Sequence, residues 1–299
     1  MRIAVFTKNR VNPAYAAARL GADRVAARFG ASITHYVPQR PDDADEQVAQ
    51  VEAALLERPD AIVLTPVHPS RIDAALEKVV AAGIPLFGFI SDLPAQPWRS
   101  FAGSDDRKLA EALAADVFAR LSGEGVVAFV QGSFDSKTAI DRAAGFADAA
   151  ARFPGIRVAG SCEGRYDFEA ARGAVGALLR GVPDIDAVIA ANDMMALGAI
   201  AALREVGRTA LVAGINAIPE AIKAIRRGEM VATADFNAMN LAAIAVECAV
   251  RHLGGEAVPR RVMLPVQIID AGNAVLWDAP FADRPQIAWA DAIGACIQE

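Results

Sequence analysis

The sequence predicts an α/β protein built on doubly wound parallel sheets. Short apolar runs such as Ala187–Ala190 contain no alternating polar residues, which is typical of parallel strands buried on both faces. Each run is followed by a longer segment whose apolar residues recur at helical spacing, as Met195, Leu197 and Ile200 do after this strand. Because strands and helices alternate along most of the chain, helices on both faces and right-handed crossovers are expected.

The alternation starts at the first residues. Pro13 stands in the first turn of the first expected helix and Gly30 follows its end, as is typical of helix termini. Ser70 is expected to cap the beginning of a later helix, and Gly83 to end it. The elements expected in this part are Ile3–Phe6 (strand), Pro13–Phe29 (helix), Ala31–Val37 (strand), Asp45–Glu57 (helix), Ala61–Leu64 (strand), Ser70–Ala81 (helix) and Ile84–Phe89 (strand).

A second α/β series begins near Gly103. The stretch Ser91–Trp98 contains two prolines and no periodicity, so we expect a loop there. We expect two successive α/β units with a boundary near Gly103, but not two independent proteins, since nothing resembling a linker separates the two series. The second series is expected to contain helix Asp105–Leu121, strand Val126–Val130, helix Thr138–Arg152, strand Val158–Ser161, helix Phe168–Leu179, strand Ala187–Ala190, helix Met194–Val206, strand Leu211–Ala213 and helix Pro219–Arg227.

The last quarter of the chain has a different character. A strand at Val231–Ala234, a helix at Met239–Leu253 and an extended stretch at Val262–Ile269 are expected. The tail from Ala271 contains aromatic residues that we expect to pack against the body of the protein: Trp277, Phe281 and Trp289.

Composition excludes several classes of protein. The chain has 299 residues, of which 54% are hydrophobic, but no apolar run approaches the ~20 residues of a membrane span. Its formal net charge is -6 and it has no basic tract, which disfavours nucleic acid as a partner. No charged region followed by an apolar stretch opens the chain, so we expect either a cytoplasmic protein or a mature form without its leader.

Signatures of catalysis or of a metal site are missing. Cys162, Cys248 and Cys296 are far apart and do not have metal-ligand spacing, so inert thiols are expected, with one disulfide as an alternative. No glycine-rich phosphate loop follows the first strand, and no nucleophile elbow occurs. We therefore predict a protein that is not an enzyme and needs no cofactor and no metal.

Polar residues follow nearly every expected strand. Since the carboxyl ends of parallel strands lie at one edge of a sheet, these side chains should converge there. Amides, hydroxyls, a lysine and tyrosines suit a small polar ligand, because polar groups bind its hydroxyls and aromatic rings cover its C–H surfaces. The segments are Lys8–Tyr15, Thr65–His68, Ser91-Asp92, Gln131–Lys137, Tyr166-Asp167, Asn192-Asp193 and Asn216.

The pair Asn192-Asp193 has two interpretations. Both residues could serve only the start of the helix that follows. Alternatively, Asp193 caps that helix and Asn192 contacts a ligand at the end of the strand. The recurrence of asparagine after other strands, at Asn12 and Asn216, favours the second interpretation.

Several motifs make the chain resemble a known family, the periplasmic binding proteins of the ribose-binding type, which share their fold with the ligand domains of lactose-repressor-family regulators. The likeness covers nearly all of residues 1–270. It is strongest in Asn12–Tyr15, Ser104-Asp105, Gln131-Gly132, Arg142–Phe146 and Ala191–Ala199, and is reinforced by Ala221–Ile225 and Met230–Thr233.

The resemblance implies two lobes that close on a ligand by a hinge motion. One lobe would contain residues 1–103 and 237–265, and the other residues 104–236 and 266–299. Three crossovers would join the lobes, near Gly103, near residues 235–237 and near Pro265.

The resemblance also implies ligand contacts. Asn12 and Tyr15 match first-loop contacts, with Tyr15 stacked on a sugar ring, and Lys8 matches a lysine of some hexose-binding relatives. Asn192 matches a ligand-contacting asparagine of the family. The full set of expected contacts is Lys8, Asn12, Tyr15, Thr65, His68, Asp92, Tyr166, Asn192, Asn216 and Phe236.

Three departures from the family pattern make ribose itself an unexpected ligand. Ile140 stands in the place of an arginine that ribose binders use, Phe236 stands where a glutamine is usual, and Asp92 is offset by one residue from the family's aspartate. Another sugar, a polyol or a related hydroxylated compound is expected instead.

The leading prediction is a solute-binding component of an ABC importer, periplasmic in its mature form, with a membrane permease as its partner. It would be neither membrane-spanning nor bound to nucleic acid. The alternative is the effector domain of a lactose-repressor-type regulator without its DNA-binding part. Such regulators have a helix-turn-helix before the first strand, which this chain lacks, and a longer connection than Glu205–Ala210.

Overall fold

The structure is a computed structural model and describes residues 1–93, 95–182 and 184–294. The chain forms two compact units. Unit 1 contains Met1–Ser104, Asn237–Pro265 and the segment from Phe281, and unit 2 contains Asp105–Phe236 and Val266–Pro280. The predicted α/β class with two mainly parallel sheets is confirmed.

The sheet of unit 1 has the order β11-β5-β4-β3-β1-β2, and every neighbouring pair in it is parallel. Strands β1, β3 and β4 are buried almost throughout, as their continuous apolar runs predict, and β5, which was not among the expected strands, is buried as well. The strands are β1 (Arg2–Phe6), β2 (Ser32–Tyr36), β3 (Ala61–Leu64), β4 (Leu86–Phe89), β5 (Ser100–Gly103) and β11 (Arg261–Met263).

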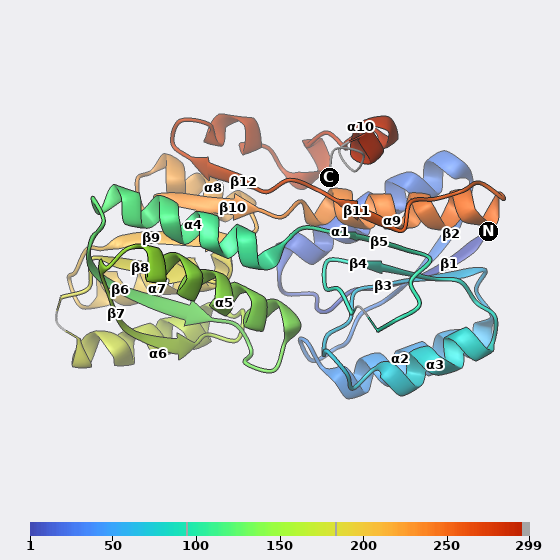
Figure 1. The fold of residues 1–299 in the computed structure, drawn as a ribbon, viewed down its shortest axis with the longest axis horizontal. Coiled ribbons are helices and arrows are strands. Elements are labelled where there is room, and N and C mark those ends of the chain that lie inside the picture. Colours follow the sequence, from blue (N-terminus) through green and yellow to red (C-terminus); the bar gives the residue numbers. More distant parts are fainter. Residues whose placement is uncertain (94, 183, 295–299) are drawn as a thin grey trace. The chain divides into compact units, whose positions relative to one another are not determined.

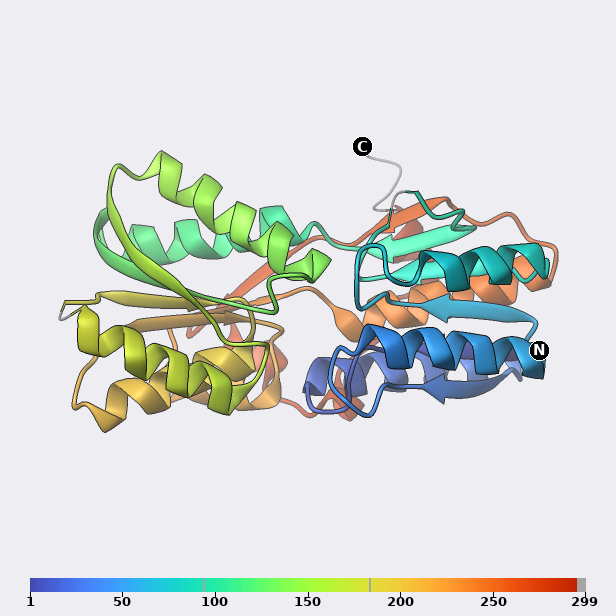
Figure 2. The same cartoon turned by 90° about the horizontal axis from the view of Figure 1, so that it is seen from below.

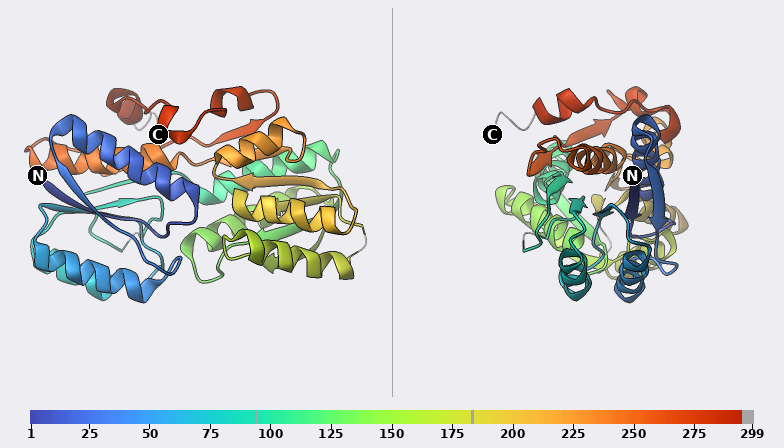
Figure 3. Two further views of the ribbon diagram at one scale, coloured as in Figure 1. Left: turned by 180° about the vertical axis from the view of Figure 1, so that it is seen from behind. Right: turned by 90° about the vertical axis from the view of Figure 1, so that its right-hand side faces the viewer.

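Helices cover both faces of this sheet, with α1 beside α9 on one face and α2 beside α3 on the other (Figures 1 and 3). Gly21 of α1 lies so close to α9 that an added Cβ would meet the carbonyl oxygen of Met239 at 2.1 Å. The helices of unit 1 are α1 (Pro13–Phe29), α2 (Ala44–Glu57), α3 (Asp73–Ala81), α9 (Ala238–Leu253), the 3₁₀ turn η2 (Phe281–Asp283) and α10 (Trp289–Gly294).

The sheet of unit 2 has the order β12-β10-β9-β8-β6-β7. Its strands are parallel except for β12, which pairs with β10 in the antiparallel direction. The strands are β6 (Glu124–Gln131), β7 (Gly155–Glu163), β8 (Ala187–Ala190), β9 (Leu211–Ile215), β10 (Ala232–Asp235) and β12 (Gln267–Asp270).

In unit 2, α4 packs beside α5 and α6 beside α7, with the sheet between the two pairs (Figure 2). Asp105, expected as the first residue of this helix, instead caps α4 by accepting hydrogen bonds from the amides of Arg107 and Lys108. The helices are α4 (Asp106–Arg120), α5 (Lys137–Arg152), α6 (Phe168–Gly181), α7 (Asp193–Glu205), α8 (Pro219–Arg226) and the 3₁₀ turn η1 (Ala274–Trp277).

The prediction that Ser70 caps the third helix is wrong. Helix α3 begins at Asp73, and Ile72, the residue before it, makes no side-chain cap. The amide of Ser70 instead donates to Nδ1 of His68 at 3.1 Å, so Ser70 belongs to the turn that precedes the helix.

The C-terminal segment differs from its predicted course. We expected all of residues 266–299 to lie in the second lobe, but only Val266–Pro280 belongs to unit 2 and the chain from Phe281 packs with unit 1. The chain therefore passes between the units a fourth time, at Pro280-Phe281, in addition to the three predicted crossovers.

Candidate functional site

Three neighbouring strands of unit 1 bring polar residues to one edge of the sheet. Lys8 follows β1, Thr65 follows β3 and Ser91 follows β4, and β3 lies between the other two strands. The Lys8 side chain donates a hydrogen bond from Nζ to Ser91 Oγ at 2.8 Å, so it reaches across the end of β3. Lys8 is only 4% exposed, which is unusual for a lysine. Burying its ammonium group costs free energy unless hydrogen-bond acceptors or an opposite charge stabilise it.

Ser91 was not among the predicted contacts, and the backbone before it is strained. Ile90 has φ +65°, a left-handed conformation that a β-branched residue rarely adopts. Such strain costs about 1–3 kcal/mol and is concentrated at functional sites. Here it turns the chain at the end of β4 so that Ser91 meets Lys8.

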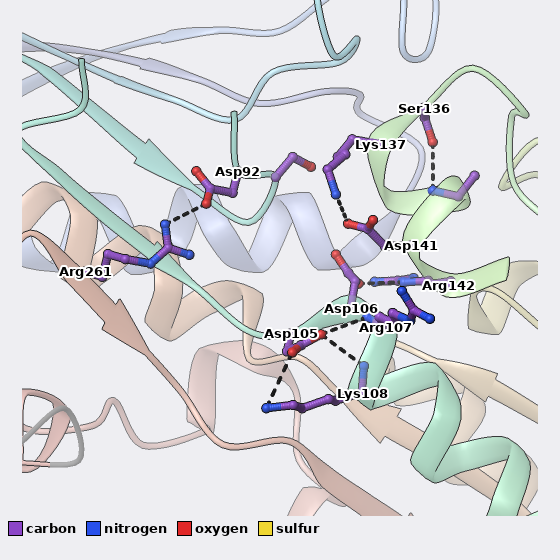
Figure 4. A network of polar contacts seen from close by, with 12 residues as sticks. Asp92, Asp105, Asp106, Arg107, Lys108, Ser136, Lys137, Asp141, Arg142 and Arg261 are labelled. Atoms are coloured by element: carbon purple, nitrogen blue, oxygen red, sulfur yellow. Dashed lines mark hydrogen bonds and ion pairs between the residues drawn. The ribbon is translucent and has the colours of Figure 1, made fainter. Parts of the chain in front are cut away.

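Three side-chain oxygens of unit 1 are buried without a hydrogen-bond partner among the described residues: Gln50 Oε1 in α2, and Thr65 Oγ1 and Asp92 Oδ1 in the segments after β3 and β4. The Thr65 carbonyl is satisfied by Gln47 Nε2 at 3.0 Å, and Asp92 Oδ2 accepts from Arg261 Nη1 at 2.6 Å (Figure 4). An unsatisfied buried polar atom costs about 1–3 kcal/mol, and a bound hydroxyl group could satisfy it.

Asn12 and Tyr15 stand at the start of α1, at the same edge of the sheet. Asn12 Oδ1 caps the helix by accepting from the amide of Ala14 at 3.0 Å, and its own amide donates to Asn9 Oδ1 at 2.9 Å. Both predicted contacts are buried. Asn12 therefore has a structural role in addition to any contact with a ligand.

His68 has a structural role in the β3–α3 loop. Its Nδ1 accepts hydrogen bonds from the amides of Ser70 and Arg71, both at 3.1 Å. Only Nε2 of this ring is left for the ligand contact that the sequence predicts.

In unit 2, Tyr166 is held in a specific position after β7. Tyr166 and the preceding Arg165 both have left-handed φ angles, +58° and +52°. The phenol oxygen lies 3.2 Å from Ser136 Oγ. The ring packs against Gly132, where an added Cβ would lie 2.0 Å from Tyr166 Cζ.

The prediction that Asp193 caps the helix is wrong, because Asn192 is the helix cap. Asn192 has extended backbone angles, and its Oδ1 accepts from the amide of Met195 at 2.8 Å. Its Nδ2 donates to the carbonyl of Tyr166 at 3.2 Å, which ties the end of β8 to the Tyr166 loop. Asn192, itself a predicted ligand contact, thus also positions Tyr166, which is another predicted contact.

Asp193 lies inside the unit and connects three strand ends. Its Oδ1 accepts from Thr233 Oγ1 at 2.6 Å and its Oδ2 from the amide of Ile218 at 3.0 Å. Gly214 leaves room for the carboxylate, since an added Cβ would lie 2.5 Å from Oδ1. Burial raises the pKa of Asp193 to about 7, against the effect of these two hydrogen bonds.

Arg142, which belongs to the motif Arg142–Phe146 and is not among the predicted contacts, lies beside the end of β8 and the predicted contact Phe236. It is 2% exposed, and its Nε donates to Asp106 Oδ1 at 2.7 Å (Figure 4). A second guanidinium nitrogen donates to the carbonyl of Ala191. Its guanidinium carbon lies 5.4 Å from the centre of the Phe236 ring. Ile140, the position where we had looked for the arginine, is 50% exposed.

Asn216, at the end of β9, also has a left-handed backbone. Its φ is +130°, and Ala217 follows with φ +51°. The Asn216 amide donates to the carbonyl of Ala234 at 2.8 Å, and the residue is buried. Asn216, Asn192 and Phe236 thus follow β9, β8 and β10, which are neighbours in the sheet.

Other classes of site find no support in the described residues. No group of three or more His, Cys, Asp or Glu side chains among them could hold a metal ion. No helix in the described part of the chain is long and apolar enough to cross a membrane. Cys248 is buried and its Sγ accepts a hydrogen bond from Ser100 Oγ at 3.3 Å, Cys162 is half-buried, and Cys296 lies outside the described residues.

Comparison with known proteins decides the family. A family model described as "Periplasmic binding protein domain" matches residues 3–257. The chain is a periplasmic binding protein. It belongs to a family that binds solutes and does not catalyse reactions, so the prediction that it is not an enzyme is confirmed, and family membership implies a location outside the cytoplasm.

Individual relatives agree with this family. The ribose import binding protein RbsB of Bacillus subtilis (strain 168) is 27% identical over 259 residues, which cover 86% of this chain and 83% of the relative. A solved ABC transporter periplasmic solute-binding protein from Actinobacillus succinogenes 130z, with bound D-allose, is 26% identical with a TM-score of 0.87, covering 92% of this chain and 99% of that one. A solute-binding protein from Bacillus halodurans C-125, with bound myo-inositol, is 27% identical with a TM-score of 0.86, covering 93% and 96% of the two chains.

These comparisons support the leading functional prediction of an ABC-type solute-binding protein. The alternative, a regulator's effector domain, finds no support in them. The prediction of ligand contacts stays a prediction, since the comparisons name no residues.

Proposed function

We propose that this periplasmic binding protein captures a small polyhydroxylated ligand, a monosaccharide or a polyol, for an ABC importer. The relatives with named ligands bind D-allose and myo-inositol, and a third is a ribose import protein. All three ligands are compact molecules whose surface consists of hydroxyl groups and C–H faces.

The observation that carries the proposal is that two buried oxygens without a partner among the described residues, Thr65 Oγ1 and Asp92 Oδ1, follow strands β3 and β4 of unit 1. A carboxylate oxygen accepts from a ligand hydroxyl, and the threonine hydroxyl can donate or accept. Lys8 Nζ adds a charged donor at the same edge. Ligand hydroxyls would therefore remove a desolvation cost that the ligand-free unit bears.

Unit 2 would contribute the remaining contacts from Tyr166, Asn192, Asn216 and Phe236, to which we add Arg142. Aromatic rings suit the C–H faces of a sugar ring, while the amides and the guanidinium suit its hydroxyls. Closure of the two lobes about the crossovers would enclose the ligand, as the resemblance implies.

Ribose is part of the test, because α5 does carry a buried arginine, Arg142, two residues after Ile140. The isoleucine at position 140 therefore no longer disfavours ribose. The other two departures, at Phe236 and Asp92, still favour a ligand other than ribose.

We also propose that the mature protein lies in the periplasm and delivers its ligand to a membrane permease. The names of the relatives support this role, since they are import proteins or ABC transporter components. Copurification of the protein with its permease in detergent, stimulated by the ligand, would test the partnership.

Thermal unfolding in the presence of candidate ligands tests the function directly. We expect a pentose, hexose or polyol to raise the melting temperature, because a ligand that binds only the native state stabilises it by mass action. At 100 times its Kd the ligand would add about 2.7 kcal/mol. Sugar acids and nucleosides serve as the contrasting classes. If one of those classes shifts the transition and no neutral polyhydroxylated compound does, the proposed ligand class is wrong.

A further inference from the structure

The C-terminal segment, residues 271–294, begins beyond the family match, which ends at residue 257. Its first part, residues 271–280, is fixed to unit 2. Trp277 Nε1 donates to Asp235 Oδ2 at 2.9 Å, and Asp278 forms an ion pair with Arg226. Asp235 is the last residue of β10 and lies directly before the crossover at Phe236-Asn237.

The second part of the segment, residues 281–294, is fixed to unit 1. The guanidinium of Arg24 donates to the carbonyls of Ala282 and Arg284, the second at 3.2 Å. The guanidinium carbon of Arg251 lies 4.6 Å from the centre of the Trp289 ring.

Two further hydrogen bonds tie this part to the helices of unit 1. Gln286 Nε2 donates to the carbonyl of Gly21 in α1 at 3.2 Å. The amide of Ile287 donates to Asn240 Oδ1 at 3.0 Å. Asn240 lies in the first turn of α9, on the other side of the same crossover, and its Nδ2 donates to Asn237 Oδ1 at 2.8 Å.

The segment thus holds both ends of one crossover, Asp235 before it and Asn240 after it. Only Ala279, Pro280 and Phe281 separate Asp278, which is fixed to unit 2, from Ala282, which is fixed to unit 1. The four steps from Asp278 to Ala282 can extend to about 14 Å at most. The Cα atoms of Asp278 and Ala282 cannot move further apart than this. As long as both residues keep their contacts, the parts of the two units that they contact are restrained as well.

We propose that residues 271–294 form a strap that limits how far the two lobes open. The proposal rests on the proposed function, in which the lobes close on a ligand. A strap that excludes widely open conformations raises the population of nearly closed ones, and a ligand that binds the closed form then binds more tightly. Trp277 and Ile287 would be positioning residues, which act on the hinge and not on the ligand.

Lengthening the strap without touching its contacts tests this. We would insert Gly-Ser-Gly-Ser between Ala279 and Pro280, which leaves Trp277, Asp278 and Arg24 in place. The control carries the same insertion between Glu256 and Ala257, two exposed residues in the α9–β11 connection within unit 1. The radius of gyration of the ligand-free proteins is measured by small-angle X-ray scattering, and Kd by calorimetry with the best polyol or sugar of the thermal screen.

The lengthened strap is expected to give a larger radius of gyration without ligand than the control has, and a Kd raised roughly three- to tenfold. The bound forms should have equal radii. Ligand-free radii equal to those of the control would overturn the proposal. If no polyhydroxylated compound binds even the wild type, the proposed function fails, but the ligand-free scattering still decides whether the strap restrains the lobes.

Discussion

The ring of Tyr166 occupies the space in which Gly132 would carry a β-carbon, 2.0 Å from Tyr166 Cζ. Gly132 directly follows β6, and Tyr166 lies in the loop after β7, the neighbouring strand. The absence of a side chain at Gly132 therefore fixes where the aromatic ring of this loop can lie. We infer that Gly132 acts on the ligand site through Tyr166.

Gly132→Ala should displace the Tyr166 ring and weaken ligand binding by about tenfold or more, equivalent to ~1.4 kcal/mol. Calorimetric titration with the ligand of the thermal screen measures this. Gly176→Ala is the matched control, because Gly176 lies in α6 with open space around it and the change should stabilise the helix by about 0.5–1 kcal/mol. Affinity within twofold of wild type in Gly132→Ala would show that the ring position does not matter for binding.

Asn192 has two structural hydrogen bonds, and two substitutions separate them. Asn192→Ser should keep a helix cap and lose the bond to the Tyr166 carbonyl, so it should lower the free energy of unfolding by less than Asn192→Ala does, while ligand binding is lost. Asn192→Ala should lose both bonds and also about 1 kcal/mol of stability. Urea unfolding and ligand titration of both variants check this. If Asn192→Ser binds the ligand with wild-type affinity, Asn192 caps the helix and does not contribute to binding.

The repeated elements of the fold could be predicted from the sequence because their signals are local. A buried strand is a short run of apolar residues, and α1 ends as expected at a glycine with φ +65°. The polar residues after the strands were predicted as a group for the same reason, since parallel strands place their carboxyl ends at one edge.

Contacts between distant segments could not be predicted in this way. The helix cap was assigned to Asp193 and not to Asn192 because both are good capping residues, and only the positions of Thr233 and Ile218 show that Asp193 faces the interior. Arg142 looks like a surface residue of an amphipathic helix until Asp106 is brought beside it. The course of the tail depends on single contacts such as that of Trp277 with Asp235, which have no periodic pattern.

Thr65→Val replaces a buried hydroxyl that has no partner with a methyl group of similar shape. We expect unchanged stability or a gain of up to about 1 kcal/mol, because a buried unsatisfied group is removed, together with weaker ligand binding. Thr233→Val is the matched control, since this buried hydroxyl donates to Asp193 at 2.6 Å and its loss should cost about 1–3 kcal/mol. Chemical unfolding and titration of both variants measure the contrast. A clear loss of stability in Thr65→Val, with unchanged affinity, would contradict a ligand contact there.

The raised pKa of Asp193 makes stability depend on pH in a predictable direction. The carboxyl has a pKa of about 7 in the folded protein and 3.8 as its ordinary value, so between these pH values the folded state keeps a proton that the unfolded state has lost. The stability contributed by this proton is complete below about pH 4 and is lost as the pH rises to 7, in total up to about 4 kcal/mol.

Asp193→Asn removes the titration while it keeps the shape of the side chain, although one acceptor for Thr233 or Ile218 is lost. Urea unfolding at pH 5, 6, 7 and 8 should therefore show wild type losing stability relative to the variant up to about pH 7 and running parallel to it above. Curves that stay parallel from pH 5 to pH 8 would mean that Asp193 is already ionised in the folded protein at pH 5, with Thr233 and the Ile218 amide sufficient to hold its charge.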